Sequence, residues 1–180
     1  MLRLLLLRHA KSAWDNAVMG DFDRTLNARG RLAPPLMGAY MQTNALLPDR
    51  ILCSSAMRTR ETLAGLLPSL SEECSVELTR DLYEVSAQEA FEVLMERGGS
   101  AGTLLNIGHN PATQELALGL LSRGDNTLID SIENKYPTAA LTVIDFDITD
   151  WSALKPGSGL LVSFTRPADL DDSLAPQRPG

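Results

Sequence analysis

The stretch Leu2-Arg3-Leu4-Leu5-Leu6-Leu7-Arg8-His9 decides the fold of this chain. Its run of four leucines predicts a short buried strand, and the strand ends directly before two side chains that can carry chemistry. Similar apolar runs recur along the chain and alternate with stretches of helical pattern, which is typical of βα units around a largely parallel sheet. The predicted strands cover residues 2–7, 50–53, 75–78, 103–107, 140–146 and 160–165.

The stretches between these strands predict helices over residues 56–70, 87–97 and 112–121, where apolar side chains recur three and four positions apart. Residues 27–43 have the same pattern, but Pro34 and Pro35 predict a late start or a kink. Asn110-Pro111 predicts an N-cap and a first helical residue, so that a helix begins right after His109.

These elements predict an α/β protein. We expect a single-domain three-layer α/β/α sandwich over residues 1–166, with a mostly parallel sheet and an antiparallel edge strand. Residues 167–180 are rich in proline and aspartate and are predicted to form a disordered tail.

The composition limits the classes of function. With 180 residues, 44% of them hydrophobic, the chain suits one domain. Its net charge of −7 is the opposite of what nucleic-acid binding requires, so no nucleic-acid partner is expected. The apolar run at residues 4–7 is too short for a membrane span or a signal segment, and Cys53 and Cys74 do not form a disulfide framework. We therefore expect a soluble cytoplasmic protein with no membrane partner.

Polar side chains follow the ends of the first four predicted strands. Ligands of open α/β sheets bind beyond the carboxyl ends of the strands. The residues at these positions are Arg8 and His9; Ser54, Ser55 and Arg58; Tyr83 and Glu84; and Gly108, His109 and Asn110.

This set includes both histidines of the chain, His9 and His109, beside Arg8 and Arg58. Two imidazoles and two guanidinium groups suit a dianionic phosphoryl group. The sequence therefore predicts a phosphate site that needs no metal and no other cofactor. Ser54 and Ser55 could equally be caps of the following helix.

Five short motifs occur in order between Met1 and about Leu121. They are Leu4-Leu5-Leu6-Leu7-Arg8-His9-Ala10-Lys11-Ser12, Thr25-Leu26-Asn27-Ala28-Arg29-Gly30, Ser54-Ser55-Ala56-Met57-Arg58-Thr59, Leu82-Tyr83-Glu84 and Gly108-His109-Asn110-Pro111. Together they resemble the histidine phosphatase (phosphoglycerate mutase-like) superfamily. Within it, the sequence around both histidines looks most like that of the bacterial SixA-like phosphohistidine phosphatases.

The resemblance implies a role for each matching residue. His9 would attack phosphorus, while Arg8, Arg58 and His109 would bind the phosphoryl oxygens. Glu84 stands where many members carry a proton donor.

The resemblance also implies that Ser12 contacts the substrate, which would be a phosphorylated protein or a small-molecule phosphate. The sequence departs from the family pattern at Ala10, where glycine is usual, and at Asp15, where many members have a phosphate-contacting asparagine.

These roles define a mechanism. Imidazole has an ordinary pKa of about 6.5, so His9 can attack without a separate base. Arg8, Arg58 and a protonated His109 would neutralise the charge on the phosphoryl oxygens. Water would then hydrolyse the phosphohistidine, and Glu84 would protonate the leaving group and deprotonate the incoming water.

Other phosphatase classes fit less well. A cysteine phosphatase would use Cys53, but Arg58 follows it one residue too early, so Cys53 is expected to be a buried strand residue. Asp-x-Asp-x-Thr occurs at Asp21 and at Asp145, as in aspartyl phosphatases, yet too little chain follows for that fold, so both are expected to be loop or strand-end residues.

Two further alternatives stay open. The chain could be a non-catalytic phosphate-binding module, although the retained His9 argues against this. It could also be a mutase-like phosphotransferase or a small-molecule phosphomonoesterase, but mutases of the superfamily have longer chains with inserts that enclose the substrate.

Overall fold

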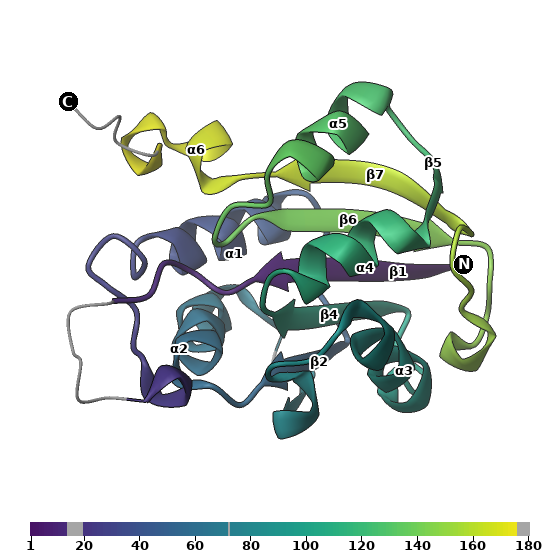
Figure 1. The fold of residues 1–180 in the computed structure, drawn as a ribbon, viewed down its shortest axis with the longest axis horizontal. Helices are drawn as coiled ribbons and strands as arrows, with labels where there is room; N and C mark the ends of the chain where they lie inside the picture. Colours follow the sequence, from purple (N-terminus) through teal and green to yellow (C-terminus); the bar gives the residue numbers. More distant parts are fainter. Residues whose placement is uncertain (14–19, 72, 176–180) are drawn as a thin grey trace.

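A twisted sheet forms the centre of the computed structural model, which describes residues 1–13, 20–71 and 73–175. Within these residues the sheet has seven strands in the order β3-β2-β4-β1-β6-β7-β5 (Figure 1). The strands are β1 (Leu2–Arg8), β2 (Arg50–Ser54), β3 (Ser75–Thr79), β4 (Thr103–Gly108), β5 (Leu121–Arg123), β6 (Leu141–Phe146) and β7 (Gly159–Thr165). All six predicted strands are therefore confirmed to within one residue at each end.

The sheet is mostly parallel. β1 pairs in parallel with β4, and β2 pairs in parallel with β4 and β3. β6 runs antiparallel to both of its neighbours, β1 and β7. The predicted α/β class is confirmed, but the antiparallel strand lies inside the sheet and not at its edge. A loop without a crossover helix joins β6 to β7, and such a connection makes neighbouring strands antiparallel.

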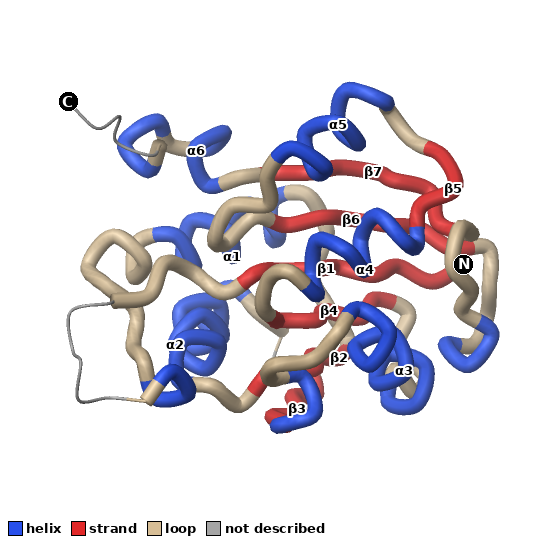
Figure 2. Tube along the Cα trace, in the orientation of Figure 1, coloured by secondary structure: helices blue, strands red, loops and turns tan. Residues whose placement is uncertain are grey.

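Helices cover both faces of the sheet (Figure 2). They are α1 (Ala33–Thr43), α2 (Met57–Leu66), α3 (Ala87–Arg97), α4 (Ala112–Leu120), α5 (Asn126–Asn134) and the short α6 (Pro167–Leu170). Alternate residues of β1 supply both faces: Leu4 and Leu6 join the apolar cluster under α3 and α4, while Leu5 and Leu7 join the cluster under α1 and α2. This alternation produces the predicted three layers.

Prolines lie at the starts of α1 and α4. α1 begins at Ala33, six residues after the start of its apolar pattern, which is the late start that we gave as one of two outcomes, and its first turn contains proline. α4 begins at Ala112, and its N-cap is Pro111, so Asn110 is not the cap that we predicted. The helix still starts close to His109, because the Thr113 amide and hydroxyl both donate to the His109 carbonyl, at 2.9 and 3.0 Å.

Neither β5 nor α5 was predicted from the sequence. β5 has three residues, which is too short for a recognisable pattern. α5 buries only Ile132, and the Asp125 side chain caps it by accepting from the Thr127 amide at 2.7 Å.

The prediction of a disordered tail is wrong for residues 167–175. These residues form α6 and a 3-10 turn, Asp172–Leu174. Leu174 is only 8% exposed and packs in the cluster under α1, while its carbonyl accepts a hydrogen bond from Arg29. A single apolar anchor in a polar segment is invisible to composition. Residues 176–180 lie outside the described residues.

The segment that follows β1 is braced by the Thr25 to Gly30 motif. Ser12 forms an antiparallel bridge with Leu26, and the Asn27 amide donates to the Lys11 carbonyl at 3.0 Å. A Cβ atom at Gly30 would lie 2.0 Å from the same Lys11 carbonyl oxygen. Only glycine lets the two backbones approach this closely.

We predict that Gly30→Ala lowers the free energy of unfolding by roughly 1–3 kcal/mol, because the new methyl group forces Lys11 aside. Gly119→Ala is the matched control: a Cβ there meets no atom within 4 Å, and alanine is the better helix former. Urea unfolding of both variants measures the difference. A Gly30→Ala protein as stable as the Gly119→Ala protein contradicts the brace.

Candidate active site

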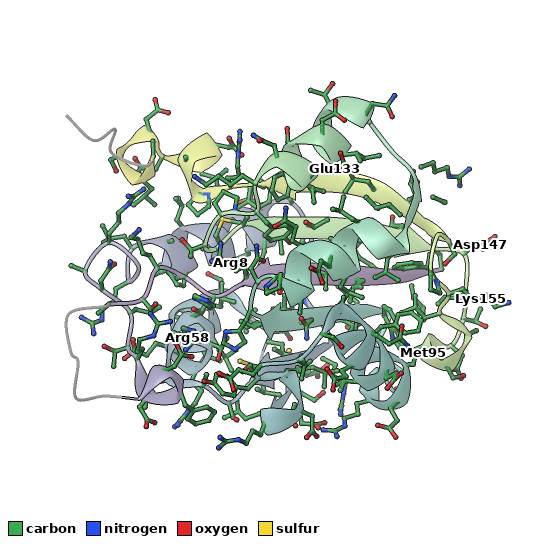
Figure 3. The ribbon with its side chains drawn as sticks, viewed as in Figure 1. Arg8, Arg58, Met95, Glu133, Asp147 and Lys155 are labelled. Atoms are coloured by element: carbon green, nitrogen blue, oxygen red, sulfur yellow. The ribbon has the colours of Figure 1, made fainter. Side chains whose placement is uncertain are left out.

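A cleft of about 650 Å³ opens at the carboxyl ends of the central strands. Every predicted site residue lines it: Arg8, His9, Ser12, Arg58, Glu84 and His109. Figure 3 shows Arg8 and Arg58 at this end of the sheet, whereas Asp147 and Lys155 lie at the opposite end. The edge of the sheet that the sequence indicated is therefore where these side chains meet.

The pairing of β1 with β4 brings the two histidines together. Arg8 lies opposite Gly108 in the parallel register, and the His9 amide donates to the Gly108 carbonyl at 3.0 Å. The residues after each strand then emerge side by side, with the His9 and His109 ring centroids 5.2 Å apart.

The His9 ring is held in one orientation and one tautomer. Its Nδ1 lies 2.7 Å from the Ala10 carbonyl oxygen, which can only accept, so Nδ1 carries the proton. Burial lowers the pKa of His9 well below its usual value, and His109, Arg58 and Arg8 lower it further against the effect of the Ala10 hydrogen bond. His9 is therefore neutral at pH 7, and its Nε2 keeps a lone pair.

His109 is also neutral in this structure. Burial and the Arg58 charge lower its pKa to about 3. The protonated His109 predicted for the bound phosphoryl group therefore requires that this group raise the pKa of the ring. Its Nε2 lies 2.7 Å from the Ser54 hydroxyl, so Ser54 positions the ring, while the contact of this hydroxyl with the Ala56 amide is long, at 3.5 Å. Nδ1 of His109 is buried without a partner among the described residues.

The two arginines are oriented by main-chain carbonyls. Arg8 donates through Nη1 to the Tyr136 carbonyl at 2.7 Å. Arg58, which is 6% exposed, donates through Nη1 to the Asp21 carbonyl at 2.7 Å. Guanidinium stays charged under these conditions, so both arginines supply fixed positive charge to the cleft.

Sequence reasoning missed Asp21, which it treated as a loop residue. Its carboxylate accepts from Arg58 at 3.0 Å and from the Tyr83 hydroxyl at 2.8 Å, and it pairs with Arg24 at 2.9 Å. Burial alone would raise the pKa of Asp21, but these partners outweigh burial and the net shift is downward. The Asp-x-Asp-x-Thr motif was a signal for this acid, although it suggested a different enzyme class.

The remaining candidates have clear positions. Glu84 is exposed at the rim, with φ of 55°, a left-handed backbone that is uncommon outside glycine. Ser12 is buried in the cleft wall. Cys53 is buried in β2 and burial raises its pKa to about 12, so its thiol is not ionised. Asp145 pairs with Arg3 at 2.7 Å on β6. Asp15 lies outside the described residues.

In residues 1–13, 20–71 and 73–175, no three His, Cys, Asp or Glu side chains are grouped as a metal site. None of the helices in this described part of the chain is long and apolar enough to cross a membrane.

Comparison with known proteins identifies the family. The model of the histidine phosphatase superfamily (branch 1) matches residues 4–97. The uncharacterized protein Rv1276c of Mycobacterium tuberculosis (strain ATCC 25618 / H37Rv) is 32% identical over 163 residues, which are 89% of this chain and 99% of that protein. The chain belongs to the histidine phosphatase superfamily.

Several solved structures have the same fold as this chain. SixA of Agrobacterium tumefaciens superposes with a TM-score of 0.75 at 25% identity, over 92% of this chain and 98% of that one. SixA of Nakamurella multipartitia shares the fold, with a TM-score of 0.80 at 24% identity over 92% and 96% of the two chains. The protein histidine phosphatase SixA in complex with tungstate also shares it, at 21% identity and a TM-score of 0.72 over 94% and 100%.

The neutral histidines make stability depend on pH. Their pKa values in the folded protein lie below the unfolded value of about 6.5, so the unfolded chain binds more protons below pH 6.5. We predict that the free energy of unfolding is constant above pH 7 and falls below 6.5 by about 1.4 kcal/mol per pH unit for each histidine.

Urea unfolding at pH 7.0, 5.5 and 4.5 measures this slope. His109→Asn should lower it by about half, because the chain has two histidines and both lie in the cleft. A flat slope in this range means that the folded protein takes up protons as readily as the unfolded chain, and a slope unchanged in the variant means the same for His109.

Proposed function

We propose that this protein is a metal-independent phosphatase that hydrolyses its substrate through a phosphohistidine at His9. The observation that carries the proposal is the His9 ring itself. The Ala10 carbonyl holds the proton on Nδ1, and the lowered pKa keeps the ring neutral, so the Nε2 lone pair is available to attack phosphorus.

The charge in the cleft supports phosphoryl binding. Arg8 and Arg58 are oriented before any ligand arrives, so they can stabilise charge on the phosphoryl oxygens without reorganisation. Nδ1 of His109 has no partner among the described residues, so it can donate to a phosphoryl oxygen when it carries a proton. A nearby dianion would favour this by raising the pKa of the ring. Ser12 would contact the same group.

Two carboxyl groups, Glu84 and Asp21, could donate a proton to the leaving group. Glu84 lines the rim of the cleft, where a departing group would pass. Asp21 is engaged with Arg58 and has a lowered pKa, so it is a poor acid at neutral pH. We therefore assign the donor role to Glu84.

The open cleft also bears on the substrate. We propose protein phosphohistidine as the substrate class, because the cleft can receive a side chain that projects from a protein surface. We propose that the protein acts in the cytoplasm. A small-molecule phosphomonoesterase or a mutase-like phosphotransferase is the second candidate. A non-catalytic phosphate-binding module would have no need for a neutral, oriented His9.

The first test is to trap the intermediate. Rapid quenching with labelled phosphoramidate should leave an acid-labile, alkali-stable phosphoryl group, which mass spectrometry places on His9. His9→Ala should abolish labelling and lower turnover by roughly 10³-fold or more, as expected for a lost covalent nucleophile.

Cys53→Ser is the control, and it should keep both the label and the turnover. Turnover should also survive EDTA, because arginines supply the charge that a metal would supply elsewhere. A strict Mg²⁺ requirement, or a label that moves with Cys53, refutes the assignment.

The second test concerns Glu84 and the substrate. An alkoxide leaving group needs a general acid, whereas imidazole can leave as a neutral molecule with little help. Glu84→Gln should lower turnover of an alkyl phosphomonoester by roughly 10²–10⁴-fold and turnover of phosphohistidine far less.

Glu96→Gln on the exposed face of α3 is the matched control, and it should leave both rates unchanged. Equal losses on both substrates with Glu84→Gln would indicate a structural role. No loss on either would remove Glu84 from the site.

A further inference from the structure

A second pocket of about 480 Å³ adjoins the cleft. The two share Arg8, Lys11 and Thr138 in their walls, so one opens beside the other. The second pocket lies between the end of α5 and the segment of α6, and apart from the shared Arg8 none of its wall residues has a role in the mechanism above. Its wall carries five cationic side chains and one acidic one: Arg8, Lys11, Arg29, Lys135, Arg166 and Asp169.

Most of this positive charge has no counter-charge in the wall. Arg166 and Asp169 pair with each other at 2.7 Å. Arg8 and Arg29 donate to the main-chain carbonyls of Tyr136 and Leu174, which carry no net charge.

Lys11 and Lys135 are exposed and have no carboxylate partner among the described residues. The chain as a whole carries a net charge of −7, but the cationic side chains of this wall lie close together and repel one another. A bound anion would relieve that repulsion.

Apart from Thr138, the rest of the wall is apolar and is fixed by contacts with the core. It includes Pro137, Pro167, Ala168 and Leu174. Leu174 is anchored in the core, and the Ala139 amide donates to the carbonyls of Arg8 and His9, which ties this wall to the end of β1. Apolar patches beside lysines suit a polypeptide segment, whose backbone and side-chain stems pack on proline while its carboxylates reach the ammonium groups.

We propose that the second pocket binds an acidic segment of the phosphorylated protein substrate, next to the phosphorylated residue. The proposal rests on the proposed function and names what recognises the substrate. The phosphoryl group would occupy the cleft between Arg8 and Arg58, and aspartates or glutamates a few residues away would meet Lys11 and Lys135. The cationic wall then steers acidic substrates toward His9.

The test compares two phosphohistidine peptides of equal length, one with glutamate and aspartate around the phosphorylated residue and one with glutamine and asparagine. The acidic peptide should have a kcat/KM roughly 10-fold higher at low salt, because electrostatic steering raises association rates by this order or more. The ratio should approach 1 at about 0.5 M NaCl, since salt screens exposed charges.

Lys135→Glu should bring the ratio to about 1 or below at low salt. Lys155→Glu is the matched control: it makes the same charge change at an exposed lysine, which lies at the opposite end of the sheet from Arg8 (Figure 3). It should leave the ratio unchanged. Thermal unfolding of both variants verifies that they fold.

Fluorescence anisotropy with the unphosphorylated acidic peptide separates this proposal from the phosphatase assignment. In one outcome Lys135→Glu weakens binding, Lys155→Glu does not, and neither phosphohistidine peptide is turned over. This outcome would overturn the phosphatase assignment and support the acidic-segment pocket. A ratio of 1 in the unaltered protein, or equal effects of the two variants, would overturn the pocket while the phosphatase stands.

Discussion

The register between β1 and β4 is the constraint on which the site depends. Arg8 opposite Gly108 makes both strands end at the same level, so His9 and His109 leave the sheet together. A shift of one residue would turn every β1 side chain to the other face. Arg3 and Arg8, on either side of Leu4 to Leu7, resist such a shift, because it would move one of the two arginines into the place of a buried leucine. The strand at the centre of the core therefore also sets how close the two imidazoles lie.

The site is costly to assemble and ready before a ligand arrives. Two histidines are kept neutral by burial and by arginines that already lie beside them. Asp21 holds Arg58 in place and balances part of its charge. Desolvation that a substrate would otherwise have to bring about is thus already accomplished during folding, and the stability of the core compensates for it.

Much of this could be predicted because it depends on local pattern. Apolar runs locate the strands, and the rule that ligands bind at the carboxyl ends selects His9, Arg58 and His109 without any comparison. The failures concern contacts between distant segments. The internal place of β6, the anchoring of Leu174 and the pairing of Asp21 with Arg58 each depend on which parts of the chain meet in space.

The protonation of His109 could not be read from the sequence for a related reason. Residue identity supplies an ordinary pKa, but burial and the nearby Arg58 decide the shift. Both follow only from the assembled cleft.

The position of the chain ends has a practical consequence. Met1 lies where β1 begins, at the far end of the sheet from the cleft, whereas Leu174 is packed beside the pocket lined by Lys11 and Arg166 (Figure 1). Attachment to a biosensor surface through the first residues would leave the mouth of the cleft facing the solution. Coupling at Ala175, directly after Leu174, would start the linker beside that pocket.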